Sequence, residues 1–128
     1  MDPTSNGTLQ DFPTELRTQA SAALDAERAH LAELKKQQRS IEADDNDLSA
    51  KLNKFEKELY GGKVRNPKEL LDLQREVDAL KSKRTELEEK ELVIMEQADT
   101  ANTVVEKIAA DLAKLQAGRR EQNNQLTS

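Results

Sequence analysis

The chain has 128 residues, of which 35% are hydrophobic, 35% are charged and only 2% are aromatic, and its formal net charge at pH 7 is −5. So few large apolar side chains exclude an ordinary globular core, and the composition is instead typical of long exposed helices. The absence of cysteine excludes disulfides and cysteine-ligated zinc, and the single histidine, His30, cannot build a histidine metal site. Neither a secretory signal nor an apolar stretch of membrane-spanning length, about 20 residues, is present, so we expect a cytoplasmic protein.

The first segment, residues 1–12, is rich in Asp, Pro, Thr, Ser, Asn and Gly. A segment of this composition buries little apolar surface, which predicts a disordered N-terminal tail. Phe12 precedes Pro13. A residue before proline is disfavoured in helical conformation, while proline itself suits the first helical turn. The first helix is therefore predicted to begin at Pro13.

From residue 13 to residue 60, apolar residues recur at alternating steps of three and four, as in the seam of a coiled coil. One predicted seam row consists of Leu24, Leu31, Gln38, Asp45, Leu52 and Leu59, and the other of Ala20, Glu27, Leu34, Ile41, Leu48 and Phe55.

A connector follows at residues 61–66. Gly61 and Gly62 end the first helix and allow the chain to reverse. Asn66 is a suitable cap for a second helix, and Pro67 suits its first position.

The second helix, residues 67–126, keeps the same phase over roughly eight heptads, well beyond the three or four that indicate a coiled coil. Its two rows are Leu70, Val77, Arg84, Glu91, Ala98, Val105, Leu112, Arg119 and Leu126, and Leu73, Leu80, Leu87, Ile94, Ala101, Ile108, Leu115 and Gln122. Two such helices joined by a short connector pair only in antiparallel orientation. The predicted fold class is all-α, a long antiparallel two-helix coiled-coil hairpin over residues 13–126.

The short connector places the end of the first helix beside the start of the second. Residues on the two helices are therefore predicted to pair when their numbers sum to roughly 125 to 132, a range that allows a shift of one heptad. Asp45 then lies within about one layer of Arg84, and Gln38 lies similarly close to Glu91. A polar pair in an apolar seam lowers stability but penalises slipped alignments, so Asp45 and Arg84 are predicted to set the register. The alternative is that these long side chains reach out of the narrow seam into solvent.

The predicted helices differ in length. At about 1.5 Å per residue, the first spans roughly 70 Å and the second roughly 90 Å. The second helix would then extend beyond the first, leaving Leu112, Leu115 and Leu126 unpaired. Such an overhang predicts dimerisation, a protein partner or a truncated chain.

Basic residues outnumber acidic ones between residues 51 and 84, whereas acidic residues dominate elsewhere. The candidate residues for binding an acidic protein or nucleic-acid phosphates at the tip are Tyr60, Lys63, Arg65, Asn66 and Lys68. The alternative is a solvated helix face with intrahelical ion pairs. No pairing of a nucleophile with a base, no phosphate-binding glycine loop and no metal motif is found, so no enzyme activity is predicted.

The connector carries a family resemblance. Residues 59–70 read LYGGKVRNPKEL, residues 73–77 read LQREV, and Leu87-Glu88 and Met95-Glu96 follow. Residues 13–126 resemble the N-terminal coiled-coil hairpin of a bacterial family in which the hairpin is followed by a four-cysteine zinc ribbon. The resemblance implies a cytoplasmic adaptor or chaperone-like protein, with members associated with flagellar or type III secretion, with the enhancer-dependent sigma factor, or with nucleic acid. Because the chain lacks cysteine, zinc is expected only in a full-length relative, and the chain is expected to be part of a longer protein.

The sequence therefore favours a non-catalytic module for protein–protein interaction. Two other interpretations stay open: a nucleic-acid-binding coiled-coil arm, similar in shape to the hairpin of seryl-tRNA synthetases, and a structural dimerisation rod. The acidic body of the chain disfavours nucleic acid but leaves binding at the tip open.

Overall fold

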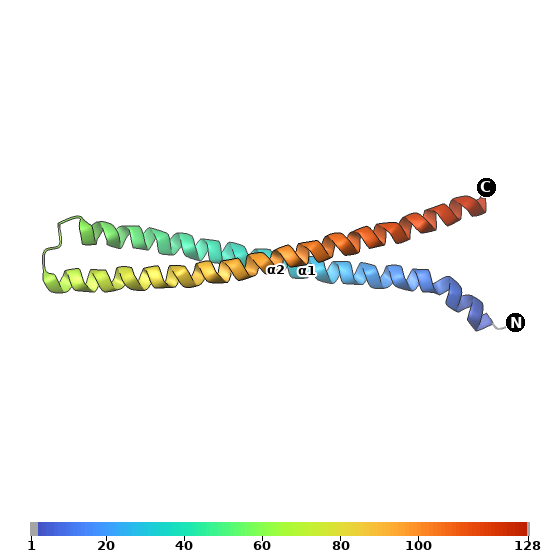
Figure 1. Ribbon diagram of the computed structural model, residues 1–128, viewed down its shortest axis with the longest axis horizontal. Helices are drawn as coiled ribbons and strands as arrows, with labels where there is room; N and C mark the ends of the chain where they lie inside the picture. The colour runs from blue at the N-terminus through green and yellow to red at the C-terminus, as the bar shows by residue number, and fades with distance from the viewer. Residues whose placement is uncertain (1–2, 128) are drawn as a thin grey trace. The chain divides into compact units, whose positions relative to one another are not determined.

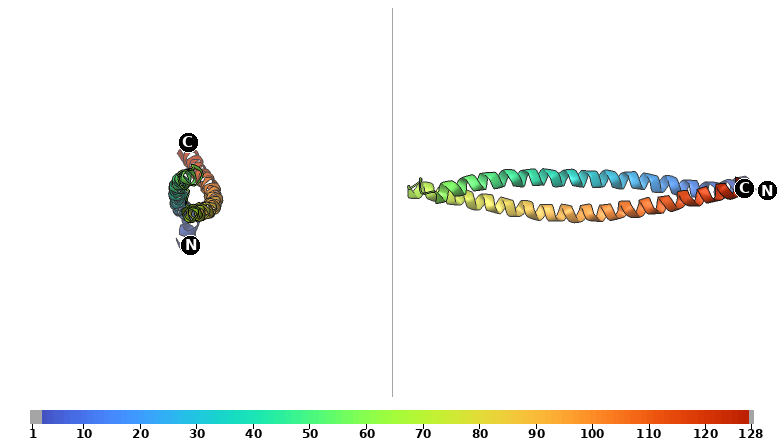
Figure 2. Two further views of the ribbon diagram at one scale, coloured as in Figure 1. Left: turned by 90° about the vertical axis from the view of Figure 1, so that its left-hand side faces the viewer. Right: turned by 90° about the horizontal axis from the view of Figure 1, so that it is seen from above.

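A computed structural model describes the backbone of residues 3–127 and the side chains of residues 13–118. The described chain forms two α-helices and no strand: α1, Pro3–Tyr60, has 58 residues, and α2, Pro67–Thr127, has 61 residues. Residues 61–66 connect them (Figures 1 and 2). The all-α helical hairpin predicted from the sequence is confirmed. The end of α1 at Tyr60 and the start of α2 at Pro67 are the predicted residues.

The helices divide between two compact units. We call residues 34–97 the loop unit, because it contains the connector, and residues 1–33 with 98–128 the terminal unit. In the loop unit α1 and α2 run antiparallel, since Asp45 contacts Arg84 and the later residue Glu56 contacts the earlier residue Lys81 (Figure 1).

The core of the loop unit lies beside the connector. Leu52, Val77 and Leu80 are buried together, with Val77 fully enclosed at 0% exposure. The partly buried side chains that pack against this cluster are Leu48, Phe55 and Leu59. All six occupy predicted seam rows. Burial of their apolar surface, worth about 25 cal/mol per Å², stabilises the helix pair here.

The core of the terminal unit includes two alanines. Leu24, Ala98 and Ala101 are buried, and Leu112 and Leu115 are partly buried. These positions also belong to the predicted rows. Every seam position between residues 13 and 118 is in fact buried or partly buried, which confirms the heptad assignment.

The N-terminal boundary of α1 differs from the prediction. The helix starts at Pro3 and includes Pro13 in its interior, so Pro3–Phe12 lie in α1 and not in a disordered tail. A proline removes one backbone hydrogen bond and disfavours a helix by about 3 kcal/mol, yet it kinks a helix as readily as it ends one.

This boundary removes the predicted overhang. With 58 residues in α1 and 61 in α2, the two helices are nearly equal in length. The dimerisation argument that rested on unpaired Leu112 and Leu115 therefore loses its basis. Leu126 lies outside the residues whose side chains are described.

Candidate functional site

The connector between the helices is shaped by its two glycines. A Cβ atom at Gly61 would collide with the backbone carbonyl oxygen of Lys57 one turn earlier. Gly62 has a φ of 76°, a left-handed conformation that disfavours residues with a side chain. Both glycines are thus required for the chain to leave α1 in this direction.

Asn66 fixes the other end of the connector. Its side-chain Oδ1 accepts hydrogen bonds from the backbone N–H of Lys68 at 2.9 Å and of Glu69 at 3.5 Å. Its carbonyl oxygen accepts the hydrogen bond from the Leu70 N–H at 3.0 Å. Asn66 is therefore the N-cap of α2, as the sequence predicts. Its Oδ1 is thus occupied by the cap, while its side chain stays exposed beside the connector.

The remaining predicted tip residues are accessible. Lys63, Arg65 and Lys68 are exposed, and Tyr60 is 71% exposed. None of the three basic side chains forms an ion pair with the described part of the chain. Lys63 and Arg65 lie in the connector, Tyr60 is the last residue of α1, and Lys68 lies in the first turn of α2.

A groove that the sequence analysis missed lies beside the connector. It has a volume of about 430 Å³ and is formed by α1, α2 and the connector. Its lining residues are Phe55, Glu58, Val64, Glu69, Asp72, Leu73 and Glu76. We call this the acidic groove. Its signal in the sequence is the spacing of three, four and seven between Glu69, Asp72, Leu73 and Glu76, which places them on one face of a helix.

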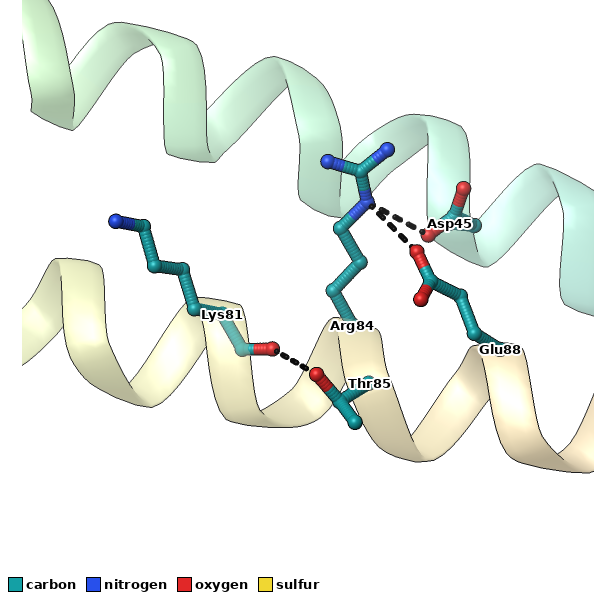
Figure 3. A network of polar contacts seen from close by, with 5 residues as sticks. All are labelled: Asp45, Lys81, Arg84, Thr85 and Glu88. Atoms are coloured by element: carbon teal, nitrogen blue, oxygen red, sulfur yellow. Dashed lines mark hydrogen bonds and ion pairs between the residues drawn. The ribbon is translucent and has the colours of Figure 1, made fainter.

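The predicted register pair is in contact inside the loop unit. Arg84 Nε lies 3.4 Å from Asp45 Oδ1 on the other helix and 3.4 Å from Glu88 Oε1 on its own helix (Figure 3). Beside it, the Thr85 hydroxyl donates to the carbonyl oxygen of Lys81 at 3.1 Å. The Asp45 side chain is only 22% exposed. The pair occupies the place in the seam that the sequence assigns to it.

The second predicted polar layer is arranged differently. Gln38 Nε2 donates to Glu42 Oε1 at 3.4 Å, along α1. Gln38 and Glu91 are both partly buried, as seam positions should be. Gln38 is thus engaged along its own helix and not across the seam.

A second feature absent from the sequence-based prediction is an apolar patch on α2. Leu92 is 61%, Val93 53% and Met95 41% exposed. Val93 also lines a groove of about 400 Å³ together with Glu86, Glu89, Lys90 and Ile94. The sequence signal for this patch is a run of four apolar residues at 92–95. Only Ile94 of these belongs to a seam row, so the other three face away from the seam.

Two further properties concern the described residues as a whole. Neither helix contains a stretch long and apolar enough to cross a membrane within the range described. The same range brings together no group of three acidic, histidine or cysteine side chains able to hold a metal ion.

Two antiparallel helices with heptad seams, a tight capped connector and a cross-seam polar pair define a coiled-coil hairpin. The chain belongs to the family of the CT398-like coiled coil hairpin domain, whose model matches residues 6–128. This finding confirms the resemblance to a coiled-coil hairpin that the connector indicated. Comparisons with curated proteins and with solved structures gave no match.

Proposed function

We propose that this chain is a non-catalytic protein–protein interaction module, a cytoplasmic arm that binds its partner through the connector end of the hairpin. The observation that carries the proposal is that residues 61–66 combine a defined backbone conformation with unpaired basic side chains. The backbone takes a conformation that requires Gly61 and Gly62 and ends at the Asn66 cap. The side chains of Lys63 and Arg65 form no ion pair within the described chain. Because the backbone conformation is already set, binding would cost side-chain entropy but little additional backbone entropy.

Tyr60 supports a protein partner. It lies at the last position of α1 and is 71% exposed. Tyrosine and arginine are enriched among residues that contribute most to protein interfaces, and Arg65 follows in the connector. An exposed tyrosine beside free basic groups gives such a surface both apolar contact and charge.

The charge distribution favours a protein over nucleic acid. Beside the connector that carries Lys63 and Arg65, the acidic groove is lined by four carboxylates, from Glu58, Glu69, Asp72 and Glu76. A phosphate backbone is uniformly negative and would be repelled by them. A protein surface with charges of both signs matches this pattern.

Within this proposal the chain acts as an adaptor or chaperone-like arm. Links to flagellar or type III secretion, or to the enhancer-dependent sigma factor, remain predictions from the family resemblance. The partner's surface should be acidic where it meets Lys63, Arg65 and Lys68.

Photo-crosslinking at the tip tests the proposal. The photoreactive residue benzoylphenylalanine would replace Tyr60, and the chain would be irradiated in its source cell. The matched control carries the same residue at Lys36, an exposed position of α1 away from the connector. We expect a protein adduct from position 60 that is absent from position 36 and that disappears when Lys63, Arg65 and Lys68 are changed to Glu.

The other outcomes would contradict the proposal. A nuclease-sensitive adduct would favour the nucleic-acid arm. An adduct between two copies of this chain would favour the dimerisation rod. The same adducts from both positions would show that the tip has no special role.

A further inference from the structure

We propose that the acidic groove is a docking site for an arginine-containing segment of a partner protein. The inference rests on the proposed function, because it names the chemistry of one partner element. The basic tip residues, by contrast, do not line this groove. The chain would thus bind a partner through two adjacent surfaces of opposite charge.

The walls of the groove come from three parts of the chain. Phe55 and Glu58 lie three residues apart on α1, and Val64 belongs to the connector. The wall from α2 consists of Glu69, Asp72, Leu73 and Glu76. Both helices and the connector build the groove, so its walls are in place before a segment binds.

The apolar lining is accessible to a ligand. Phe55, Val64 and Leu73 are only partly buried, although Phe55 also packs on the core cluster. Apolar surface that remains open in a groove of about 430 Å³ can cover the methylene groups of a long basic side chain. The aromatic ring adds a surface on which a guanidinium group stacks.

The charged lining is unneutralised. Glu58, Glu69, Asp72 and Glu76 are all exposed and make no ion pair with the described part of the chain. Asp72 and Glu76 are also one helical turn apart, a spacing at which like charges repel. A cation that enters the groove therefore gains attraction from four carboxylates and relieves this repulsion.

Arginine matches this combination better than lysine. Its planar guanidinium group donates to two carboxylate oxygens at once and stacks on aromatic rings, whereas the lysine ammonium acts as a point charge. The carboxylates lie on both helices, so a segment with two arginines around one apolar residue could contact both walls.

Fluorescence anisotropy with the full chain tests the proposal. The probe is a labelled peptide with the sequence Gly-Ser-Arg-Leu-Arg-Ser-Gly, compared with peptides in which both arginines are replaced by lysine or by glutamine. We expect saturable binding of the arginine peptide, roughly threefold weaker binding of the lysine peptide, and none of the glutamine peptide.

Variants of the chain locate the site. Asp72→Asn with Glu76→Gln should weaken binding by at least about tenfold. The matched control is Glu86→Gln with Glu89→Gln, which removes the same charge from the second groove and should change affinity by less than about twofold. Thermal melting of both variants shows that each remains folded.

Three results would overturn the proposal: no binding of the arginine peptide, equal weakening by both pairs of substitutions, or equal binding of the lysine peptide. None of them affects the photo-crosslinking result at Tyr60, so failure of this site and failure of the proposed function are distinguishable.

Discussion

Arg84 on α2 reaches across the hairpin to Asp45 on α1, with 3.4 Å between Nε and Oδ1. The same nitrogen lies 3.4 Å from Oε1 of Glu88 (Figure 3). The Nε and Oδ1 atoms are both buried, and neither forms a hydrogen bond within the described structure. A polar contact with these properties contributes little net stability, but a shift of register would separate its charges. We infer that it acts in alignment more than in stability.

Replacing both partners with leucine should stabilise the protein. Asp45→Leu with Arg84→Leu would place apolar side chains in the seam and should raise the free energy of unfolding by about 1 kcal/mol, the low end of the range for buried pairs, because the Arg84 side chain is 43% exposed. Arg84→Gln alone should lower it by about 1 kcal/mol, because Asp45 loses its cation. Glu88, which is 55% exposed, serves as the control, and Glu88→Gln should change stability by less than about 0.5 kcal/mol. Urea denaturation followed by circular dichroism measures all three.

The same double replacement should loosen the register. A slip of one heptad would face Asp45 with Val77 or Glu91 in place of Arg84. Because the chain has no cysteine, introduced pairs report alignment directly: Leu52→Cys with Val77→Cys for the native register, and Leu52→Cys with Leu70→Cys for a slipped one.

In the natural background only the native cysteine pair should form an intramolecular disulfide. In the background with leucine at positions 45 and 84, the slipped pair should form as well. Identical disulfide yields in the two backgrounds would show that Asp45 and Arg84 do not set the register.

The elements that the sequence predicted well depend on regular spacing or on local chemistry. The heptad rows predicted which side chains are buried, including Val77 and Ala101, because helical geometry fixes which positions share a face. The connector was predictable because glycine, asparagine and proline have specific backbone preferences. The start of α1 could not be predicted in this way, because Pro13 is compatible with either a helix start or a helix interior.

The candidate surfaces were harder to predict. The contact of Asp45 with Arg84 followed from the register, but the acidic groove depends on how Phe55 and Glu58 of α1 come beside Asp72 of α2. Phe55 is a seam residue, but Glu58 and Asp72 are not, and heptad periodicity gives no pairing for such positions. The net charge of residues 51–84 predicted a basic tip. A net charge does not show that carboxylates within the same segment gather in one groove.

The two connector glycines should be sensitive to alanine. Gly61→Ala would push a Cβ into the Lys57 carbonyl oxygen, and Gly62→Ala would hold alanine at a φ of 76°. Each should lower the free energy of unfolding by about 1 to 2 kcal/mol. Gly118 is the matched control, since a Cβ there meets nothing within 4 Å, and Gly118→Ala should stabilise α2 by up to about 1 kcal/mol. Equal effects at all three glycines would contradict the connector geometry.

The side chain of Asn66 should stabilise the start of α2. Asn66→Ala removes the acceptor for the Lys68 and Glu69 amides and should lower stability by about 1 kcal/mol. Asn66→Asp keeps an acceptor and should be close to neutral. Hydrogen exchange of the two amides measures the effect, with faster exchange expected only in Asn66→Ala. Unchanged exchange in that variant would show that the side chain does not cap α2.

The core cluster beside the connector should be the most sensitive part of the loop unit. Val77 is fully buried against Leu52 and Leu80, so Val77→Ala should lower the free energy of unfolding by about 2 kcal/mol through lost burial and an unfilled cavity. Leu92→Ala removes more atoms, but this side chain is 61% exposed, and the change should stay within about 0.5 kcal/mol. Urea denaturation of both variants compares them, with the slope of free energy against urea expected to be unchanged. A larger loss at Leu92 than at Val77 would mean that the apolar patch on α2 is covered in solution, as it would be by a second copy of the chain, and the free energy would then depend on protein concentration.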